Sequence, residues 1–148
     1  MNDSLKALVI DDEALSADML EYLIRKNVPA IDEVKKATNA LEGIELIKTF
    51  KPEIVFLDIQ MPFMSGFELL EQFPKANFSV IFTTAFNKYA IKAIRFSALD
   101  YLLKPIDAEE LKQSITRYTE QRKQILHYRE LYQNFLENYR SGETRNYR

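Results

Sequence analysis

Acidic, hydroxyl and basic residues follow four short apolar segments of the chain, each at the point where its segment ends. Asp11 and Asp12 follow the first segment, Asp58 follows the second, Thr83 and Thr84 follow the third, and Lys104 follows the fourth. Several carboxylates in one crevice repel one another and need a cation, and oxygen ligands suit a hard ion such as Mg²⁺. A carboxylate beside Mg²⁺ can attack phosphorus and form an acyl phosphate, with a lysine balancing the charge.

Each of these residues also has an ordinary structural explanation. An acidic pair after a strand often marks a helix N-terminus, and Asp58 alone could be a loop acid. Thr84 could be a simple strand-end hydroxyl, and Lys104 a surface lysine before the helix-initiating Pro105. In a parallel sheet, however, ligands bind at the carboxyl ends of the strands. Because all these features fall on one such rim in strand order, we favour the functional interpretation.

The elements that would position these residues are apolar runs that alternate with helical patterns. The runs are short and rich in Val, Ile, Leu and aromatic residues, which is typical of buried strands; they are Leu5–Ile10, Ile54–Leu57, Val80–Phe82 and Tyr101–Leu103. Glu33–Ala37 is a weaker strand whose two lysines suit the edge of a sheet. Strands that alternate with helices predict right-handed crossovers and a parallel sheet covered on both faces.

Start and stop signals delimit the predicted helices. A polar residue followed three positions later by an acid resembles a capping box, and this pattern occurs at Asn39 with Glu42, Ser65 with Glu68, and Asp107 with Glu110. Helices should stop near prolines, which stand at Pro29, Pro52 and Pro74. Together the strands and helices predict five β–α units in an α/β domain.

The last part of the chain differs, because its helical pattern runs without Gly or Pro from about Asp107 to Tyr139. Apolar residues recur there every seven positions, as in a heptad: Leu111, Tyr118, Ile125, Tyr132 and Tyr139. A second set of residues recurs at the same interval, beside the first: Ile115, Arg122, Arg129 and Leu136. Its two arginines weaken the heptad pattern. Two interpretations stay open, a final helix that frays beyond about Lys123 and a helical extension that pairs with another chain. Residues 141–148 are polar and are predicted to be disordered.

Composition excludes several function classes. The chain has 148 residues, 47% hydrophobic and 28% charged, as expected of one domain with a real core. The net charge of -2 shows no excess of basic residues of the kind that binds nucleic acid. The absence of cysteine excludes disulfides, thiolate catalysis and Cys-based zinc sites. With no basic leader and no apolar stretch of roughly 18 residues for a membrane span, we expect a cytoplasmic protein.

Four segments together resemble the receiver domains of two-component response regulators. They are Val9–Glu13, Phe56–Pro62 with Ser65-Gly66, Phe82–Ala85, and Asp100–Pro105. The resemblance runs from about Leu5 to Lys123, and Phe82–Asp107 is most similar to receivers of the LytTR (LytR/AlgR) class of transcription regulators. It implies a flavodoxin-like, doubly wound (βα)5 fold with strand order 2-1-3-4-5. Residues 1–123 would form the receiver, and residues 124–148 a helical extension and tail.

The resemblance also implies a role for each site residue. Asp58 would accept a phosphoryl group from a sensor histidine kinase. Asp11, Asp12 and Asp58 would hold Mg²⁺ together with the backbone carbonyl of Gln60. Lys104 would bind the phosphoryl group, and its bond to the following proline would be cis.

A switch hypothesis follows from these roles. Phosphorylation adds up to about two negative charges, which would draw Thr84 inward beside the small Ala85. Tyr101 could then turn into the vacated space. The face formed by the fourth helix (about Lys88–Ser97), the last strand and the last helix could then pair with a second copy. Hydrolysis of the phosphorylated Asp58 needs a water molecule in line with the bond to phosphorus. Phe86, two positions after Thr84, would flank the path of this water, and its apolar ring cannot orient it. We therefore expect slow self-dephosphorylation.

Two other function classes compete with this interpretation. A haloacid-dehalogenase-type phosphatase would also use Asp58 as nucleophile, but it needs a second carboxylate two residues later, where this chain has Gln60. Alternatively, a stand-alone receiver could act by protein contact. The LytTR resemblance implies a C-terminal DNA-binding domain, and we expect nothing after Tyr139 to encode one. We expect a homodimeric phosphoryl acceptor that does not act as an enzyme on other substrates. We also expect that it does not contact membranes and that this segment does not bind nucleic acid.

Overall fold

The computed structural model describes residues 4–86, 88 and 98–140. The chain divides into two compact units, Met1–Ile115 and Thr116–Arg148. The predicted helix at about Lys88–Ser97 lies outside the described residues except for Lys88, and so does the predicted disorder of residues 141–148. The boundary at residue 123 between receiver and extension stays a prediction.

A five-stranded parallel sheet forms the centre of the first unit. Its strands are β1 (Leu5–Ile10), β2 (Ile31–Ala37), β3 (Ile54–Asp58), β4 (Ser79–Thr84) and β5 (Asp100–Leu103). The strand order is β2-β1-β3-β4-β5, and every neighbouring pair is parallel. This confirms the implied order and the edge position of β2, which begins two residues earlier than the predicted Glu33.

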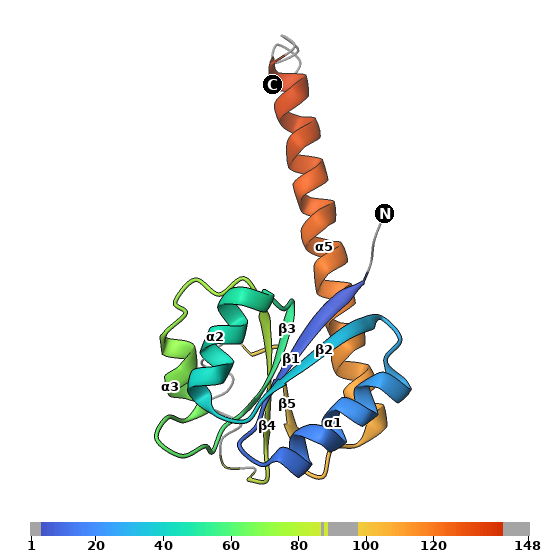
Figure 1. The fold of residues 1–148 in the computed structure, drawn as a ribbon. Coiled ribbons are helices and arrows are strands. Elements are labelled where there is room, and N and C mark those ends of the chain that lie inside the picture. The colour runs from blue at the N-terminus through green and yellow to red at the C-terminus, as the bar shows by residue number, and fades with distance from the viewer. Residues whose placement is uncertain (1–3, 87, 89–97, 141–148) are drawn as a thin grey trace. The chain divides into compact units, whose positions relative to one another are not determined.

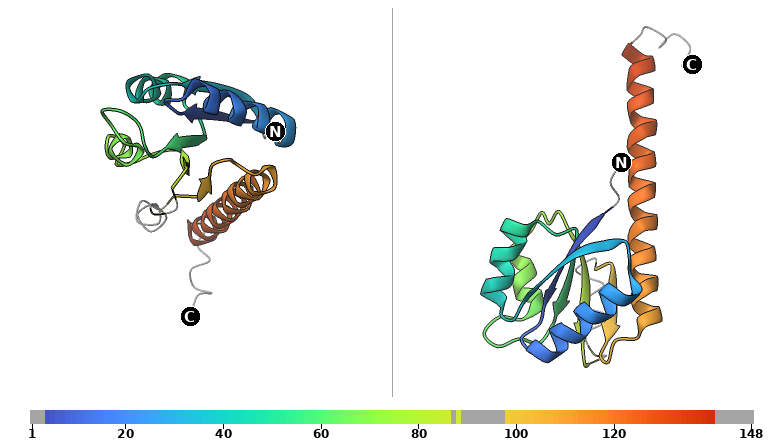
Figure 2. Two further views of the ribbon diagram at one scale, coloured as in Figure 1. Left: turned by 90° about the horizontal axis from the view of Figure 1, so that it is seen from below. Right: turned by 45° about the vertical axis from the view of Figure 1, so that its right-hand side comes forward.

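Helices cover both faces of this sheet. The helices are α1 (Ala14–Asn27), α2 (Ala40–Phe50), α3 (Gly66–Glu71) and α5 (Ala108–Arg140). Within the first unit, α1 lies on one face of the sheet, and α2 and α3 lie on the other (Figures 1 and 2). Every residue of β3 is buried as a result, which explains why that strand reads as a continuous apolar run up to Asp58.

Two of the predicted caps form with different partners. Ser65 makes a full capping box at α3, because its Oγ accepts from the Glu68 N–H while Glu68 Oε1 accepts from the Ser65 N–H. At α2, Asn39 Oδ1 accepts from the Glu42 N–H at 2.8 Å. The Glu42 carboxylate, however, accepts from the N–H of Thr38 rather than of Asn39. Asn39 is therefore an N-cap, but the return hydrogen bond from its own N–H to Glu42 that would complete a capping box is replaced by the bond from Thr38.

The helix α5 is 33 residues long and continues to Arg140, so the interpretation that it frays beyond Lys123 is wrong. Asp107 Oδ2 accepts hydrogen bonds from the N–H groups of Glu109 and Glu110 and so caps its first turn. Pairing of this helix with another chain stays a prediction. Among the described residues, no helix combines the length and apolar character needed to cross a bilayer.

Candidate functional site

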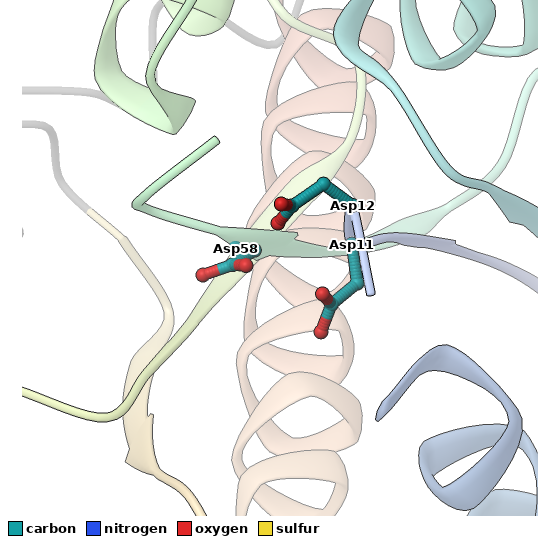
Figure 3. A group of neighbouring side chains, drawn as sticks. All are labelled: Asp11, Asp12 and Asp58. Carbon is teal, nitrogen blue, oxygen red and sulfur yellow. The ribbon is translucent and has the colours of Figure 1, made fainter. Parts of the chain in front are cut away.

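Three carboxylates meet at the carboxyl ends of the two central strands. Asp11 and Asp12 directly follow β1, and Asp58 is the last residue of the adjacent β3. One oxygen from each carboxylate lies within 4.8 Å of the others, and Figure 3 shows the three side chains side by side. Asp11 is only 3% exposed and Asp58 only 4%. The fold therefore brings together the acids that the sequence placed on one rim.

Lys104 provides the positive charge beside these acids. Its ammonium Nζ lies 2.8 Å from Asp11 Oδ2 and 3.5 Å from Asp58 Oδ2. Its backbone N–H donates to the Thr84 carbonyl at 2.7 Å, which fixes the end of β5 against the end of β4. The peptide bond from Lys104 to Pro105 is cis, as the family resemblance implied. Lys104 thus reaches both carboxylates from the neighbouring strand end.

The charges of the site change the proton affinities of Asp58 and Lys104. Burial and the charge of Asp11 raise the pKa of Asp58 from 3.8 to about 7, although Lys104 and the N–H of Gln60 oppose this rise. Burial lowers the pKa of Lys104, but its hydrogen bond to Asp11 and the charge of Asp58 outweigh burial and raise it. One lysine therefore does not neutralise the buried carboxylates, and Asp58 is the residue that is costly to ionise.

The donor set fits a hard divalent cation. The closely spaced oxygens of Asp11, Asp12 and Asp58 are hard ligands of the kind that Mg²⁺ prefers. A cation there would also relieve the repulsion that raises the pKa of Asp58. The Gln60 N–H donates to Asp58 Oδ1 at 3.3 Å, which places the Gln60 backbone next to the site. Ligation by the Gln60 carbonyl stays a prediction.

The loop after Asp58 folds tightly against it and requires glycine at residue 66. A Cβ atom at Gly66 would lie 2.5 Å from the backbone carbonyl oxygen of Asp58, well inside contact distance. The Gly66 N–H donates to the Ile59 carbonyl at 2.9 Å, and the capping box at Ser65 holds the next turn. The backbone of Asp58 is therefore held in place by the start of α3.

The two predicted switch residues, Thr84 and Tyr101, are connected through the backbone of Phe86. Thr84 is 1% exposed, and its Oγ1 accepts a hydrogen bond from the Phe86 N–H at 3.2 Å. The Phe86 carbonyl in turn accepts a hydrogen bond from the Tyr101 hydroxyl. Sequence reasoning missed this connection, because a link through a main-chain peptide leaves no signal in residue types.

An apolar cavity of about 330 Å³ adjoins the carboxylates. It is lined by Glu13, Leu15, Ser16, Met19, Leu20, Leu23, Lys104, Pro105 and Ile106. Leu15 is 78% exposed and Met19 58%, so α1 presents apolar side chains to solvent beside the site. Lys104 belongs both to this cavity and to the carboxylate cluster. The helical spacing of Leu15, Met19, Leu20 and Leu23 indicates a helix, but it does not distinguish exposed residues from buried ones.

Comparison with known proteins gives consistent matches. Residues 7–116 match the family described as response regulator receiver domain. The chain is 40% identical to the transcriptional regulatory protein BtsR of Escherichia coli and 43% identical to the sensory transduction protein LytT of Bacillus anthracis. These matches cover 80% of this chain but 49% and 48% of the two relatives, so the chain spans about half of their length. The receiver structure of AraT from Geobacillus stearothermophilus is 29% identical, with a TM-score of 0.73 over 82% of this chain and 98% of that one.

Proposed function

Because this chain belongs to the response regulator receiver domain family, we propose that Asp58 is its phosphoryl acceptor. One observation carries this assignment: Asp58 is a buried carboxylate that shares its surroundings with two further aspartates and with the ammonium group of Lys104. Asp58 is the last residue of β3, the central strand of the sheet.

Phosphorylation would proceed by direct transfer. One oxygen of the Asp58 carboxylate attacks the phosphorus atom of a phosphodonor and forms an O–P bond. The bond from phosphorus to the leaving group breaks, and the leaving group keeps the electron pair and takes up a proton. Lys104, which lies 3.5 Å from Asp58, is placed to bind a phosphoryl oxygen. When bound by Asp11, Asp12 and Asp58, Mg²⁺ would supply further neutralisation of the charge on the phosphoryl group.

The hydrogen bonds around Phe86 support a switch that responds to this transfer. A hydroxyl that turns toward a phosphoryl oxygen must give up its present geometry, so movement of Thr84 would break its bond with the Phe86 N–H. The Phe86 peptide would then be free to shift, and with it the carbonyl that now accepts from Tyr101. Loss of that acceptor would favour reorientation of the Tyr101 ring, which changes the surface beside β5.

We further propose that the phosphodonor is a sensor histidine kinase that docks over the cavity beside α1. The donor must reach Asp58, and the cavity adjoins the site through Lys104 and Glu13. The exposed Leu15 and Met19 offer apolar contact area within reach of the carboxylates. A docked surface of the kinase could therefore cover these side chains while presenting its phosphohistidine to Asp58.

The output of the switch is proposed to be regulation of transcription. BtsR is a transcriptional regulatory protein, and this chain matches about half of its length. We infer that phosphorylation controls the contact between two receivers in the cytoplasm, through the surface of β5 and the neighbouring helices, while a segment outside this chain contacts DNA. The net charge of -2 fits a unit that does not bind DNA itself.

Intact mass spectrometry after incubation with acetyl phosphate and Mg²⁺ tests the central proposal. The wild-type chain should gain the mass of one phosphoryl group, and Asp58→Ala should gain none. An Asp32→Ala variant is the matched control, since Asp32 is an exposed aspartate of β2. Equal phosphorylation of the Asp58 variant would refute the assignment. Repeated turnover of a simple phosphoester such as p-nitrophenyl phosphate would instead indicate a phosphatase.

A further inference from the structure

The second unit carries a stripe of large apolar side chains along α5. The stripe consists of Ile125, Tyr128, Tyr132, Phe135 and Tyr139, and these side chains are between 48% and 68% exposed. Their separations alternate between three and four residues. We infer that this stripe is the seam of a parallel two-stranded coiled coil, formed with a second copy of the same chain.

The alternating spacing identifies the kind of surface that the stripe fits. Separations of three and four residues give an average repeat of 3.5, which keeps one face of a helix turned toward a partner helix. Ile125 and Tyr132 then occupy the first apolar position of successive heptads, and Tyr128 and Phe135 occupy the second apolar position, three residues later. Arg129 then flanks the seam instead of interrupting it. The two arginines that weakened the heptad in the sequence therefore lie beside the apolar contacts.

The opposite side of the same helical segment is mainly polar. Glu130, Gln133, Asn134 and Glu137 occupy positions that face away from the seam, and all four are exposed. An exposed contiguous apolar stripe opposite a polar face is characteristic of an interaction surface. The polar side can stay in water while the stripe is covered, which suits a pair of helices better than burial inside a larger bundle.

The residues that border the seam favour a second copy in parallel orientation. In that arrangement Leu131 would lie opposite Leu136 of the second copy, and Gln124 would lie opposite Arg129 of the second copy. Both contacts occur twice by symmetry, and the contact between the leucines widens the apolar seam. In the antiparallel arrangement that pairs Ile125 with Phe135 and Tyr128 with Tyr132, by contrast, Arg129 would face its own equivalent. The pattern is thus self-complementary in one orientation.

The N-terminal end of the second unit sets a limit to the seam. In parallel orientation Arg117 would face Arg122 of the second copy, and like charges at such positions are unfavourable. Gln121 would occupy the seam position before Ile125. We therefore place the tightly packed part of the coiled coil from Ile125 onward and expect the helices to separate before it.

This dimer would exist whether or not Asp58 is phosphorylated, so the inference does not rest on the proposed function. Two receivers joined by a coiled coil are held at a high effective concentration, on the order of millimolar. A weak contact between receivers could then form without a change in oligomeric state. Phosphorylation would rearrange the receivers of an existing dimer rather than assemble one.

Sedimentation equilibrium of the full 148-residue chain tests the seam. Wild type should be a dimer without phosphodonor, and Tyr132→Asp with Phe135→Asp should raise the dimer dissociation constant at least about 100-fold. The matched control is Gln133→Asp with Asn134→Asp, which adds the same charges on the polar side and should leave the dimer intact. A monomeric wild type, or equal effects of the two double variants, would overturn the inference.

Cross-linking tests the orientation and does not depend on a variant that could unfold. The natural chain contains no cysteine, so Ile125→Cys introduces a single thiol. Under mild oxidation this variant should form a disulfide-linked dimer, because Ile125 meets its own equivalent only in parallel helices. Gln133→Cys, on the polar side, should stay largely uncross-linked. Failure of Ile125→Cys to cross-link would contradict the parallel seam, as would equal cross-linking of both variants.

Discussion

Replacing Asp58 with asparagine should stabilise the metal-free protein above neutral pH. Asp58 is 4% exposed and lies next to Asp11 and Asp12, so its ionised form is both desolvated and repelled. The single ammonium of Lys104, 3.5 Å away, does not compensate, because the pKa of Asp58 rises to about 7. An asparagine side chain has nearly the same shape and carries no charge. The substitution therefore removes the repulsion and leaves the packing intact.

The size of the effect follows from the pKa. The shift from 3.8 to about 7 means that ionising Asp58 in the folded protein costs on the order of 4 kcal/mol. This cost already includes the attraction of Lys104, so Asp58→Asn should stabilise the metal-free protein by up to about 4 kcal/mol. The folded protein binds more protons than the unfolded chain between these two pKa values, so wild-type stability falls as pH rises through that window. The advantage of Asp58→Asn should accordingly be small at about pH 4 and complete above about pH 7.

Urea denaturation in the presence of a chelator measures this difference. Unfolding free energies of wild type, Asp58→Asn and the exposed control Asp32→Asn should be compared at about pH 5 and about pH 8, with the control within about 0.5 kcal/mol of wild type at both. Added Mg²⁺ should stabilise wild type and narrow the gap to Asp58→Asn, because bound cation removes the repulsion. An Asp58→Asn variant that is less stable than wild type at pH 8 without metal would refute the electrostatic reasoning.

Three further changes test other parts of the site. Met19→Asp should slow phosphoryl transfer from a histidine kinase at least about tenfold and leave labelling by acetyl phosphate unchanged, since it charges the proposed docking surface alone; equal slowing with both donors would count against docking there. Gly66→Ala should lower the unfolding free energy by about 2 kcal/mol or more in urea titrations, because a Cβ atom would lie 2.5 Å from the Asp58 carbonyl oxygen; wild-type stability would show that the loop relaxes freely. Phe86→Glu should shorten the lifetime of the phosphorylated form by giving water a polar partner near Asp58, as followed by intact mass over time; unchanged or slower decay would argue against occlusion by the ring.

The strands and the rim of polar residues could be predicted because local signals and the fold agree there. Each buried strand is a short apolar run, and Asp58 and Lys104 stand where two such runs end. In a parallel sheet those ends share one edge, so the gathering of the acids followed from strand assignment alone. The strand order and the cis bond before Pro105 did not follow from the residues. They came from the resemblance to receiver domains.

Other features of the site depend on tertiary contacts that residue types do not encode. The exposure of Leu15 and Met19 depends on what packs against α1, whereas helical spacing only reports that they share a face with buried residues. The bond from Glu42 to Thr38 rather than Asn39 depends on a rotamer choice at the start of α2. Spacing also left the last helix undecided, because an apolar heptad is compatible with either fraying or pairing.

Chemical trapping of the phosphorylated residue tests the central claim most directly. The chain would be incubated with acetyl phosphate and Mg²⁺ and then treated with borohydride, which reduces an aspartyl phosphate to homoserine. Peptide sequencing by mass spectrometry should find homoserine at position 58, while the neighbouring Asp11 and Asp12 stay unchanged. Homoserine at position 11 or 12, or at none of the three, would contradict the assignment of Asp58 as the phosphoryl acceptor.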